Sequence, residues 1–188
     1  MTAKIYTGTG DQGKTSLFSG ERVYKNYDPV EAYGDVDELS SALGAIRSNL
    51  SDGDPIAEEL RQVQADLFHV GAWLATAPGS PSEPLIKQIP DGRIQAIEQA
   101  IDRMTEALPP LTSFILPGGH ITASWAHIAR TVCRRAERRV VQLFADRDED
   151  AARYEKVVVY LNRLSDYLFV LARHFNRVNR VQEVFWPA

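Results

Sequence analysis

The sequence has very little cysteine, since Cys133 is the one thiol among 188 residues. A single thiol excludes an internal disulfide framework and any metal site built from several cysteines. We therefore expect Cys133 to act as a small buried hydrophobic residue. The chain also lacks a recognisable Ser-His-Asp or Cys-His arrangement, which argues against hydrolysis by a nucleophile of the protein.

Long apolar runs are absent as well. No stretch is long enough to span a bilayer, and the first residues lack the apolar segment of a signal peptide. We therefore expect a cytoplasmic protein that does not bind membranes. The formal net charge of −4 gives no general attraction for nucleic acid, so any anion binding must come from a local cluster of basic residues.

Strand-like alternation is scarce, whereas helical periodicity is frequent. Apolar residues recur at helical spacing in five segments, often in the 4-3-4-3 pattern of a helix-bundle seam. The expected helices run from about Pro29 to Asn49, Ile56 to Leu74, Ile94 to Leu108, Gly118 to Phe144 and Val157 to Phe175. In the fourth, we expect the buried stripe to include Ile121, Trp125 and Ile128. The sequence thus predicts an all-α fold, a five-helix bundle.

The size of the chain favours a single domain spanning residues 1–188, because 44% hydrophobic content over this length supports one core. We expect an irregular N-terminal arm over residues 1–28, the bundle over 29–177 and a tail over 178–188. Two linkers interrupt the bundle. The proline-rich linker 76–90 is expected to be a surface spacer, whereas linker 109–120 carries Phe114 in a loop before the most basic helix.

The stretch from Gly8 to Thr15 matches the P-loop pattern in every letter. A P-loop needs a buried strand before its glycines and a helix that starts at its Lys-Ser/Thr pair. Here the candidate strand before the stretch, Lys4 to Tyr6, is too short for a buried central strand, and Gly20 would end any helix that follows the stretch. We therefore interpret the stretch as a glycine-rich and hydroxyl-rich loop that cradles an anion by another architecture.

Charged residues share one predicted face of the fourth helix. At 100° per residue, five side chains fall within about a quarter of the circumference: His127, Arg130, Arg134, Glu137 and Arg138. For an isolated helix, a solvated basic face is the simpler interpretation. The fifth helix adds a second polar row of Asn162, Asp166 and Arg173, and the two rows together with the glycine-rich loop suggest a triphosphate site.

Two other features have ordinary interpretations. Asp66 and His69 have the spacing of half a di-iron motif, but the other ligands of such a site are missing, so we expect His69 to be a surface histidine. The tail contains Phe185 and Trp186, which either frame a ligand or anchor the tail by packing.

Several sequence blocks in a fixed order resemble one protein family over nearly the whole chain. The blocks are Tyr6-Thr-Gly-Thr-Gly-Asp-Gln-Gly-Lys-Thr-Ser16, Gly20-Glu-Arg-Val-Tyr-Lys25, Glu31-Ala-Tyr-Gly-Asp-Val-Asp-Glu-Leu39, Phe114-Ile-Leu-Pro-Gly-Gly119, Ala129-Arg-Thr-Val-Cys-Arg-Arg-Ala-Glu-Arg138 and Tyr160-Leu-Asn-Arg-Leu-Ser-Asp-Tyr-Leu-Phe169. Together they resemble the PduO-type ATP:cob(I)alamin adenosyltransferases. The resemblance implies a five-helix bundle that forms a homotrimer with ATP bound between subunits.

The resemblance also implies roles for individual residues. The arm residues expected to contact ATP are Thr7, Gly8, Thr9, Gly10, Asp11, Gly13, Thr15, Ser16 and Lys25. The bundle residues expected to complete this site are Arg134, Arg135, Glu137, Arg138 and Asn162. Catalysis is expected to depend on Arg134, on Phe114 beneath the corrin, and on an intersubunit salt bridge between Asp37 and Arg130. The sequence departs from the family at Gly8, usually a cation, and at Asp35 and Ser40, commonly Thr and Asn.

The reaction implied by the resemblance is attack of the cobalt of cob(I)alamin on C5′ of ATP, giving adenosylcobalamin and inorganic triphosphate. Cobalt is the nucleophile, which agrees with the lack of a catalytic serine or cysteine. Mg²⁺ is expected on the triphosphate, but the sequence identifies no metal ligands. A cob(II)alamin reductase and an adenosylcobalamin-dependent enzyme are implied as partners. The alternative is a helical bundle that carries ATP or cobalamin without catalysis.

Overall fold

The computed structural model describes residues 4–145 and 148–187 of the chain. Over these residues it contains five α-helices, one 3₁₀ turn and two short strands. The elements are β1 (Lys14–Ser16), β2 (Arg22–Tyr24), α1 (Asp28–Arg47), α2 (Pro55–Leu74), η1 (Glu83–Leu85), α3 (Gly92–Glu106), α4 (Ile121–Gln142) and α5 (Asp148–Val178). The prediction of an all-α five-helix bundle is confirmed. None of the described helices combines the length and the hydropathy needed to cross a bilayer.

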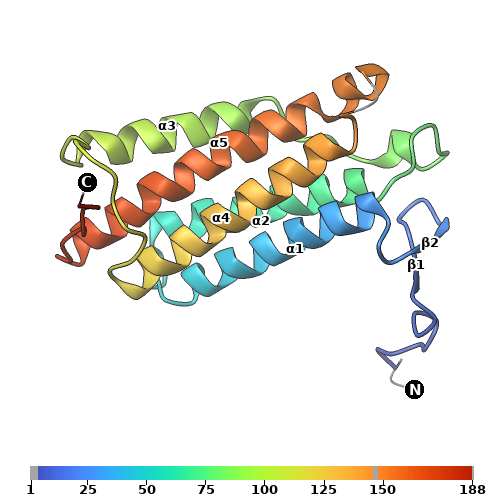
Figure 1. Ribbon diagram of the computed structural model, residues 1–188, viewed down its shortest axis with the longest axis horizontal. Coiled ribbons are helices and arrows are strands. Elements are labelled where there is room, and N and C mark those ends of the chain that lie inside the picture. The colour runs from blue at the N-terminus through green and yellow to red at the C-terminus, as the bar shows by residue number, and fades with distance from the viewer. Residues whose placement is uncertain (1–3, 146–147, 188) are drawn as a thin grey trace.

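The helices lie side by side along the long axis of the molecule (Figure 1). Helix α4 packs against both α5 and α1, α1 packs against α2, and α3 packs against α5. Figure 1 also shows the N-terminal arm, with the β1–β2 hairpin, extending away from the bundle at the end where α1 begins and α4 ends. The bundle therefore presents α4 along one side and holds the arm at one end.

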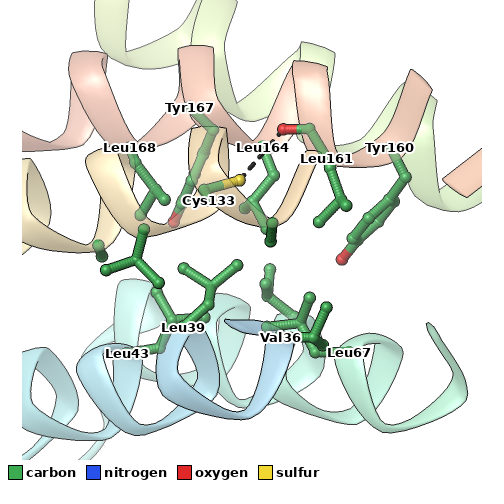
Figure 2. Packing of buried hydrophobic residues seen from close by; sticks show 14 of the residues in the cluster. Val36, Leu39, Leu43, Leu67, Cys133, Tyr160, Leu161, Leu164, Tyr167 and Leu168 are labelled. Atoms are coloured by element: carbon green, nitrogen blue, oxygen red, sulfur yellow. Dashed lines mark hydrogen bonds between the residues drawn. The ribbon is translucent and has the colours of Figure 1, made fainter. Parts of the chain in front are cut away.

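The core is built mainly from leucines of α1, α2 and α5 that meet across the bundle (Figure 2). Leu39, Leu43 and Leu164 are each 0% exposed, and burial of one such side chain stabilises the fold by roughly 2 kcal/mol. Cys133 of α4 is also 0% exposed, and its Sγ donates a hydrogen bond to the backbone oxygen of Leu161 at 3.2 Å. Burial raises the pKa of this thiol. The prediction of a buried cysteine is confirmed.

A buried carboxylate joins three helices. Asp66 of α2 is 1% exposed and accepts hydrogen bonds from Arg93 Nε of α3 at 2.7 Å and from the Tyr160 hydroxyl of α5 at 2.9 Å. Burial, reinforced by Asp66, raises the pKa of Tyr160. Asp66 is therefore a structural residue, and the described residues contain no group of three or more His, Cys, Asp or Glu placed to hold a metal ion.

The buried face of α4 differs from the predicted stripe. Ile121 and Ile128 are 52% and 48% exposed, whereas His127 is only 4% exposed. The residues that α4 buries are mostly small: Ala123, Ala126, Ala129, Val132, Cys133, Ala136 and Val140. Since α4 contacts α1 and α5 at once, its buried face must be broad, and small side chains let both neighbours approach closely. The large isoleucines lie at the edge of that face, so the prediction that they are buried was wrong.

Candidate active site

The glycine-rich stretch of the arm folds as consecutive turns that lead into a hairpin. Gly8 and Gly13 have left-handed φ angles of 70° and 76°, which glycine adopts without strain. The Asp11 amide donates to the Gly8 carbonyl at 3.3 Å, and the Gly13 amide donates to the Gly10 carbonyl at 3.1 Å. Lys14 then begins the strand β1 and not a helix. The prediction that this stretch is not a P-loop is confirmed, because no helix N-terminus follows its glycines.

Two cations of the arm lie against this loop. Arg22 of β2 donates from Nη2 to the Thr9 carbonyl at 2.7 Å, which ties the loop to the hairpin. A Cβ placed on Gly10 would lie 3.4 Å from the ammonium of Lys25, so the lysine passes directly over the glycine backbone. The hydroxyls of Thr7 and Thr9 are 2.9 Å apart. Exposed hydroxyls, glycine backbone and an ammonium group are thus concentrated in one short segment, as an anion site requires.

The second group of predicted residues lies on α4 and α5. Asn162 of α5 donates from Nδ2 to Glu137 Oε1 of α4 at 3.0 Å. On either side of this bridge, Arg134 and Arg138 are exposed, and Arg138 Nη1 donates to the Arg134 carbonyl at 3.0 Å. The structure therefore brings Arg134, Glu137, Arg138 and Asn162 together on one accessible surface, which we call the arginine face.

Arg135 points to a different neighbour. Its Nε donates to Asp35 Oδ1 of α1 at 3.0 Å, and its guanidinium also pairs with Glu38. These contacts, led by the hydrogen bond that Arg135 donates to Asp35, raise the pKa of Arg135. Within one chain Arg135 holds α4 against α1 and lies apart from the arginine face.

The loop that carries Phe114 pairs with the C-terminal tail. The Leu116 amide donates to the Val184 carbonyl at 2.7 Å, and the Trp186 amide donates to the Phe114 carbonyl at 2.8 Å. The rings of Phe114 and Trp186 meet edge to face, with centroids 6.5 Å apart. Phe114 nevertheless remains 77% exposed and Phe185 49% exposed. The tail is anchored through its backbone, and the Trp186 ring enlarges the apolar surface around Phe114.

Two buried polar residues of α5 hold this loop in place. Asn176, 2% exposed, accepts from the His120 amide at 2.9 Å and donates to the Gly118 carbonyl at 3.0 Å. Arg173, 7% exposed, donates from Nε to Glu183 of the tail at 2.9 Å and from Nη2 to the Pro109 carbonyl at 2.9 Å. The prediction that Arg173 belongs to an exposed polar row was therefore wrong. Its partner lies in the tail, where the helical pattern gave no signal.

Position 119 requires glycine because its backbone lies against the side chain of Asn176. Its φ is +110°, and an added Cβ would overlap the Asn176 amide, lying 2.7 Å from Cγ. We expect Gly119→Ala to lower the free energy of unfolding by about 2 to 4 kcal/mol, through backbone strain and loss of the amide hydrogen bonds. Denaturant unfolding measures this change. Gly118→Ala is the matched control, because its added Cβ meets no atom within 4 Å; equal losses in the two variants would contradict the role of Asn176.

Asp37 and Arg130 are not brought together within the chain. Asp37 is exposed on α1, whereas Arg130 lies on α4 with a buried Nε that has no hydrogen-bond partner among the described residues. Burial, with a smaller effect of Arg134, lowers the pKa of Arg130. Three residues before it on α4, His127 packs edge to face with the Phe169 ring, with centroids 6.3 Å apart.

The buried His127 predicts a pH dependence of stability. Burial, with a smaller contribution from Arg130, lowers the pKa of His127 to about 4. An unfolded histidine titrates near 6.5, so the unfolded chain binds more protons and stability falls as the pH drops from about 6.5 to about 4. We expect a loss of about 2 to 3 kcal/mol over this window, measured by denaturant unfolding. His127→Leu should flatten the profile by that amount; an unchanged profile would rule His127 out as its cause.

The arm and the arginine face are separate in the single chain. Figure 1 shows the arm projecting from the bundle end, away from the middle of α4 where Arg134 lies. The structure thus assembles each half of the predicted ATP site but does not join the halves within one chain.

The chain is similar to known proteins along almost its whole length. The family model for cobalamin adenosyltransferase matches residues 5–175. The corrinoid adenosyltransferase MMAB of Bos taurus is 49% identical over 174 residues, which cover 91% of this chain and 70% of that protein. A cobalamin adenosyltransferase of Cupriavidus metallidurans is 42% identical over 184 residues, which cover 98% of this chain and 94% of that protein.

A solved structure has the same fold. A variant PduO-type ATP:corrinoid adenosyltransferase from Lactobacillus reuteri, complexed with cobalamin and ATP, has a TM-score of 0.88. It is 36% identical to this chain, and the match covers 98% of this chain and 100% of that one. Fold, motifs and relatives agree, and the chain belongs to the PduO-type cobalamin adenosyltransferase family of transferases.

Proposed function

We propose that this chain transfers the 5′-deoxyadenosyl group of ATP to the cobalt of cob(I)alamin. In this reaction the cobalt(I) electron pair forms a bond to C5′, the C5′–O bond breaks, and its electron pair leaves with inorganic triphosphate. No protein nucleophile is needed, because the corrinoid substrate supplies the nucleophile. The work of the protein is to hold C5′ within about 3.5 Å of the cobalt, in line with the leaving oxygen, and to stabilise the leaving group.

The arginine face is the observation that carries this proposal. Inorganic triphosphate leaves with about four negative charges at neutral pH, and guanidinium groups bind phosphate oxygens bidentately. Arg134 and Arg138 are exposed beside the Glu137–Asn162 bridge, so both guanidinium groups are accessible to a bound polyphosphate. The bridge fixes the Asn162 amide, which then presents its remaining hydrogen-bonding capacity beside the two arginines.

The arm would supply the other half of the ATP site. Its proposed nucleotide contacts are Thr7, Gly8, Thr9, Gly10, Asp11, Gly13, Thr15, Ser16 and Lys25. Because the arm extends away from its own bundle (Figure 1), we infer that it meets the arginine face of a neighbouring subunit. In this arrangement, the ammonium of Lys25 and the guanidinium of Arg134 approach the same triphosphate from two chains. Arg135, which pairs with Asp35, would support the site by holding α4 against α1.

A homotrimer with sites between its subunits is part of the proposal. A groove of about 440 Å³ between α1 and α2 is lined by Tyr33, Asp37 and Phe68, and Phe68 is 73% exposed. Asp37 lies exposed in this groove, and the buried Nε of Arg130 on α4 lacks a partner among the described residues. A salt bridge between Asp37 and Arg130 of two subunits would satisfy both groups. Light scattering coupled to size exclusion tests the trimer.

Phe114 is proposed to lie beneath the corrin ring in the corrinoid site. Its exposed ring, with Trp186 beside it, offers an apolar surface that would displace the lower axial ligand of cobalamin. Cobalt without that ligand is easier to reduce, so a cob(II)alamin reductase is one proposed functional partner. An adenosylcobalamin-dependent enzyme, which would use the product, is the other. Mg²⁺ is proposed as the counter-ion on triphosphate oxygens. A cytoplasmic location and the single-domain organisation, with arm, bundle and tail, also belong to the proposal.

The test is to supply chemically reduced cob(I)alamin and ATP and to follow the absorption spectrum of adenosylcobalamin together with release of triphosphate. Both products in equal amounts are expected. The alternative function, a carrier that binds ATP or cobalamin without catalysis, predicts binding of the substrates without either product. Release of ADP or phosphate in place of triphosphate would contradict attack at C5′.

A further inference from the structure

The arm is attached to the bundle through a short segment that follows α2. The Phe18 amide donates to the Ala75 carbonyl at 2.8 Å, and the Ala77 amide donates to the Ser19 hydroxyl oxygen at 3.0 Å. Leu17, which precedes Phe18 and Ser19 in the loop between β1 and β2, is 7% exposed. The position of the arm therefore depends on where the backbone of residues 75–77 lies.

The same segment is held from its other side by Arg153 of α5. Its Nη2 donates to the Thr76 carbonyl at 2.9 Å, and its Cζ lies 4.4 Å from the ring centroid of Trp73. Nη1 pairs with Glu83 of η1. The Arg153 side chain is 10% exposed, so these interactions are largely shielded from solvent. One guanidinium thus fixes the last turn of α2, the segment after it, and the linker that follows.

We propose that Arg153 is a positioning residue for the ATP arm, acting through the backbone of residues 75–77. The proposal rests on the proposed function, because it assigns the arm to ATP. The planar guanidinium stacks on Trp73 while its separate N–H groups bond Thr76 and Glu83, and an ammonium group cannot do all three. Arg153 touches neither substrate in this scheme. Its effect reaches ATP only through the Ala75–Phe18 and Ala77–Ser19 hydrogen bonds.

Lys156 provides a matched control on the same helix. It lies three residues after Arg153 and pairs with Asp91, at the far end of the linker that follows residues 75–77. Replacing either residue with methionine removes one positive charge and one ion pair from α5. Only Arg153→Met also removes the hydrogen bond to the Thr76 carbonyl. Comparison of the two variants therefore separates an effect on the arm from a general loosening of the linker.

The first experiment measures the arm directly and does not depend on ATP chemistry. Trypsin is added to the full-length protein, and cleavage after Lys14, Arg22 and Lys25 is followed by mass spectrometry. Arg153→Met is expected to speed cleavage in the arm roughly three- to tenfold, because the arm opens more often when its attachment is weakened. Lys156→Met should leave the rate within about twofold of wild type. Equal acceleration in both variants would overturn the proposal.

The second experiment measures the functional consequence. Arg153→Met is expected to raise KM for ATP roughly three- to tenfold while KM for cob(I)alamin stays within about twofold of wild type. Arg153→Lys should remain closer to Arg153→Met than to wild type, since it restores charge but not the planar stacking. A lower thermal stability with an unchanged KM for ATP would overturn the proposal, because it would show a purely structural role.

Ser19→Ala keeps the proposal falsifiable if Arg153→Met folds poorly. This variant removes the Ser19 acceptor for the Ala77 amide at the edge of the bundle, and it should raise arm cleavage and KM for ATP in the same direction. In the double variant with Arg153→Met the increases should be less than multiplicative, because both changes break one path. Fully multiplicative effects would contradict that path. Absence of any adenosyl transfer by wild-type protein would instead refute the proposed function, while the cleavage results would still stand.

Discussion

Arg134→Met is expected to lower kcat/KM for ATP by about 100- to 1000-fold, because it removes a positive charge that stabilises the negative charge developing on the leaving triphosphate. Arg134 is exposed on α4 beside the Glu137–Asn162 bridge, and its guanidinium takes part in no ion pair within the described chain. Its contribution should therefore appear in binding and in the transition state. Initial rates of adenosylcobalamin formation from chemically reduced cobalamin measure the change.

Arg139→Met is the matched control for this result. Arg139 lies on the same helix, but its guanidinium faces α1, with Nη2 3.8 Å from Glu31 and Nε 3.9 Å from Asp35. Removing that charge should change kcat/KM by less than about threefold. Thermal unfolding of Arg134→Met should match wild type, because the side chain holds no other helix in place. A loss of activity of similar size in both variants would show that overall positive charge, and not the arginine face, drives the reaction.

The five helices were predictable because each carries a local apolar repeat that one helix face must bury. Leu39, Leu43, Leu164 and Leu168 follow those repeats and are fully buried. The predicted stripe of α4 failed because α4 lies between two helices, and its burial is decided by the neighbours and not by its own hydrophobicity. Alanines and His127 fill the narrow space between α4 and its neighbours α1 and α5, while Ile121 and Ile128 lie outside it.

The candidate site was predictable where its residues are sequential. The arm glycines and hydroxyls are contiguous, and Arg134, Glu137 and Arg138 are one helical turn apart, so their pattern is visible in the chain. Asn162 was visible as part of a polar row on the fifth helix, the resemblance to a known family singled it out from that row, and the structure joins it to Glu137 by a hydrogen bond. The identity of the site residues as ATP ligands remains a prediction that the proposed kinetics test.

The supporting contacts were not predictable, because they join distant segments through single side chains. Asn176 bonds the backbone around Gly118, Arg173 joins Pro109 to Glu183, and Arg153 bonds Thr76. No local repeat or spacing marks such pairs. They share a physical logic: a buried polar side chain of α5 satisfies the backbone of an irregular segment, which would otherwise have no regular hydrogen-bond partners. Through these side chains, α5 fixes both the Phe114 loop and the segment 75–77 to which the arm is attached.

Phe114→Ala is expected to slow formation of adenosylcobalamin from cob(II)alamin and a reductant by at least about tenfold, while the Kd for ATP stays unchanged. The ring is 77% exposed, so little packing is lost with it. Its proposed role is to occupy the space of the lower axial ligand, which makes cobalt easier to reduce. Reaction from cob(I)alamin supplied already reduced should fall much less, because reduction is then bypassed.

Leu116→Ala separates this role from a general loss of apolar surface. Leu116 lies two residues further along the same loop, is 47% exposed and pairs through its backbone with Val184, which the substitution preserves. We expect its rates from cob(II)alamin and from cob(I)alamin to fall together, by no more than about threefold. The ratio of the two rates is therefore the decisive quantity. If Phe114→Ala leaves that ratio at the wild-type value, the ring does not act on the axial ligand, and its exposure would have to serve binding of the corrin alone.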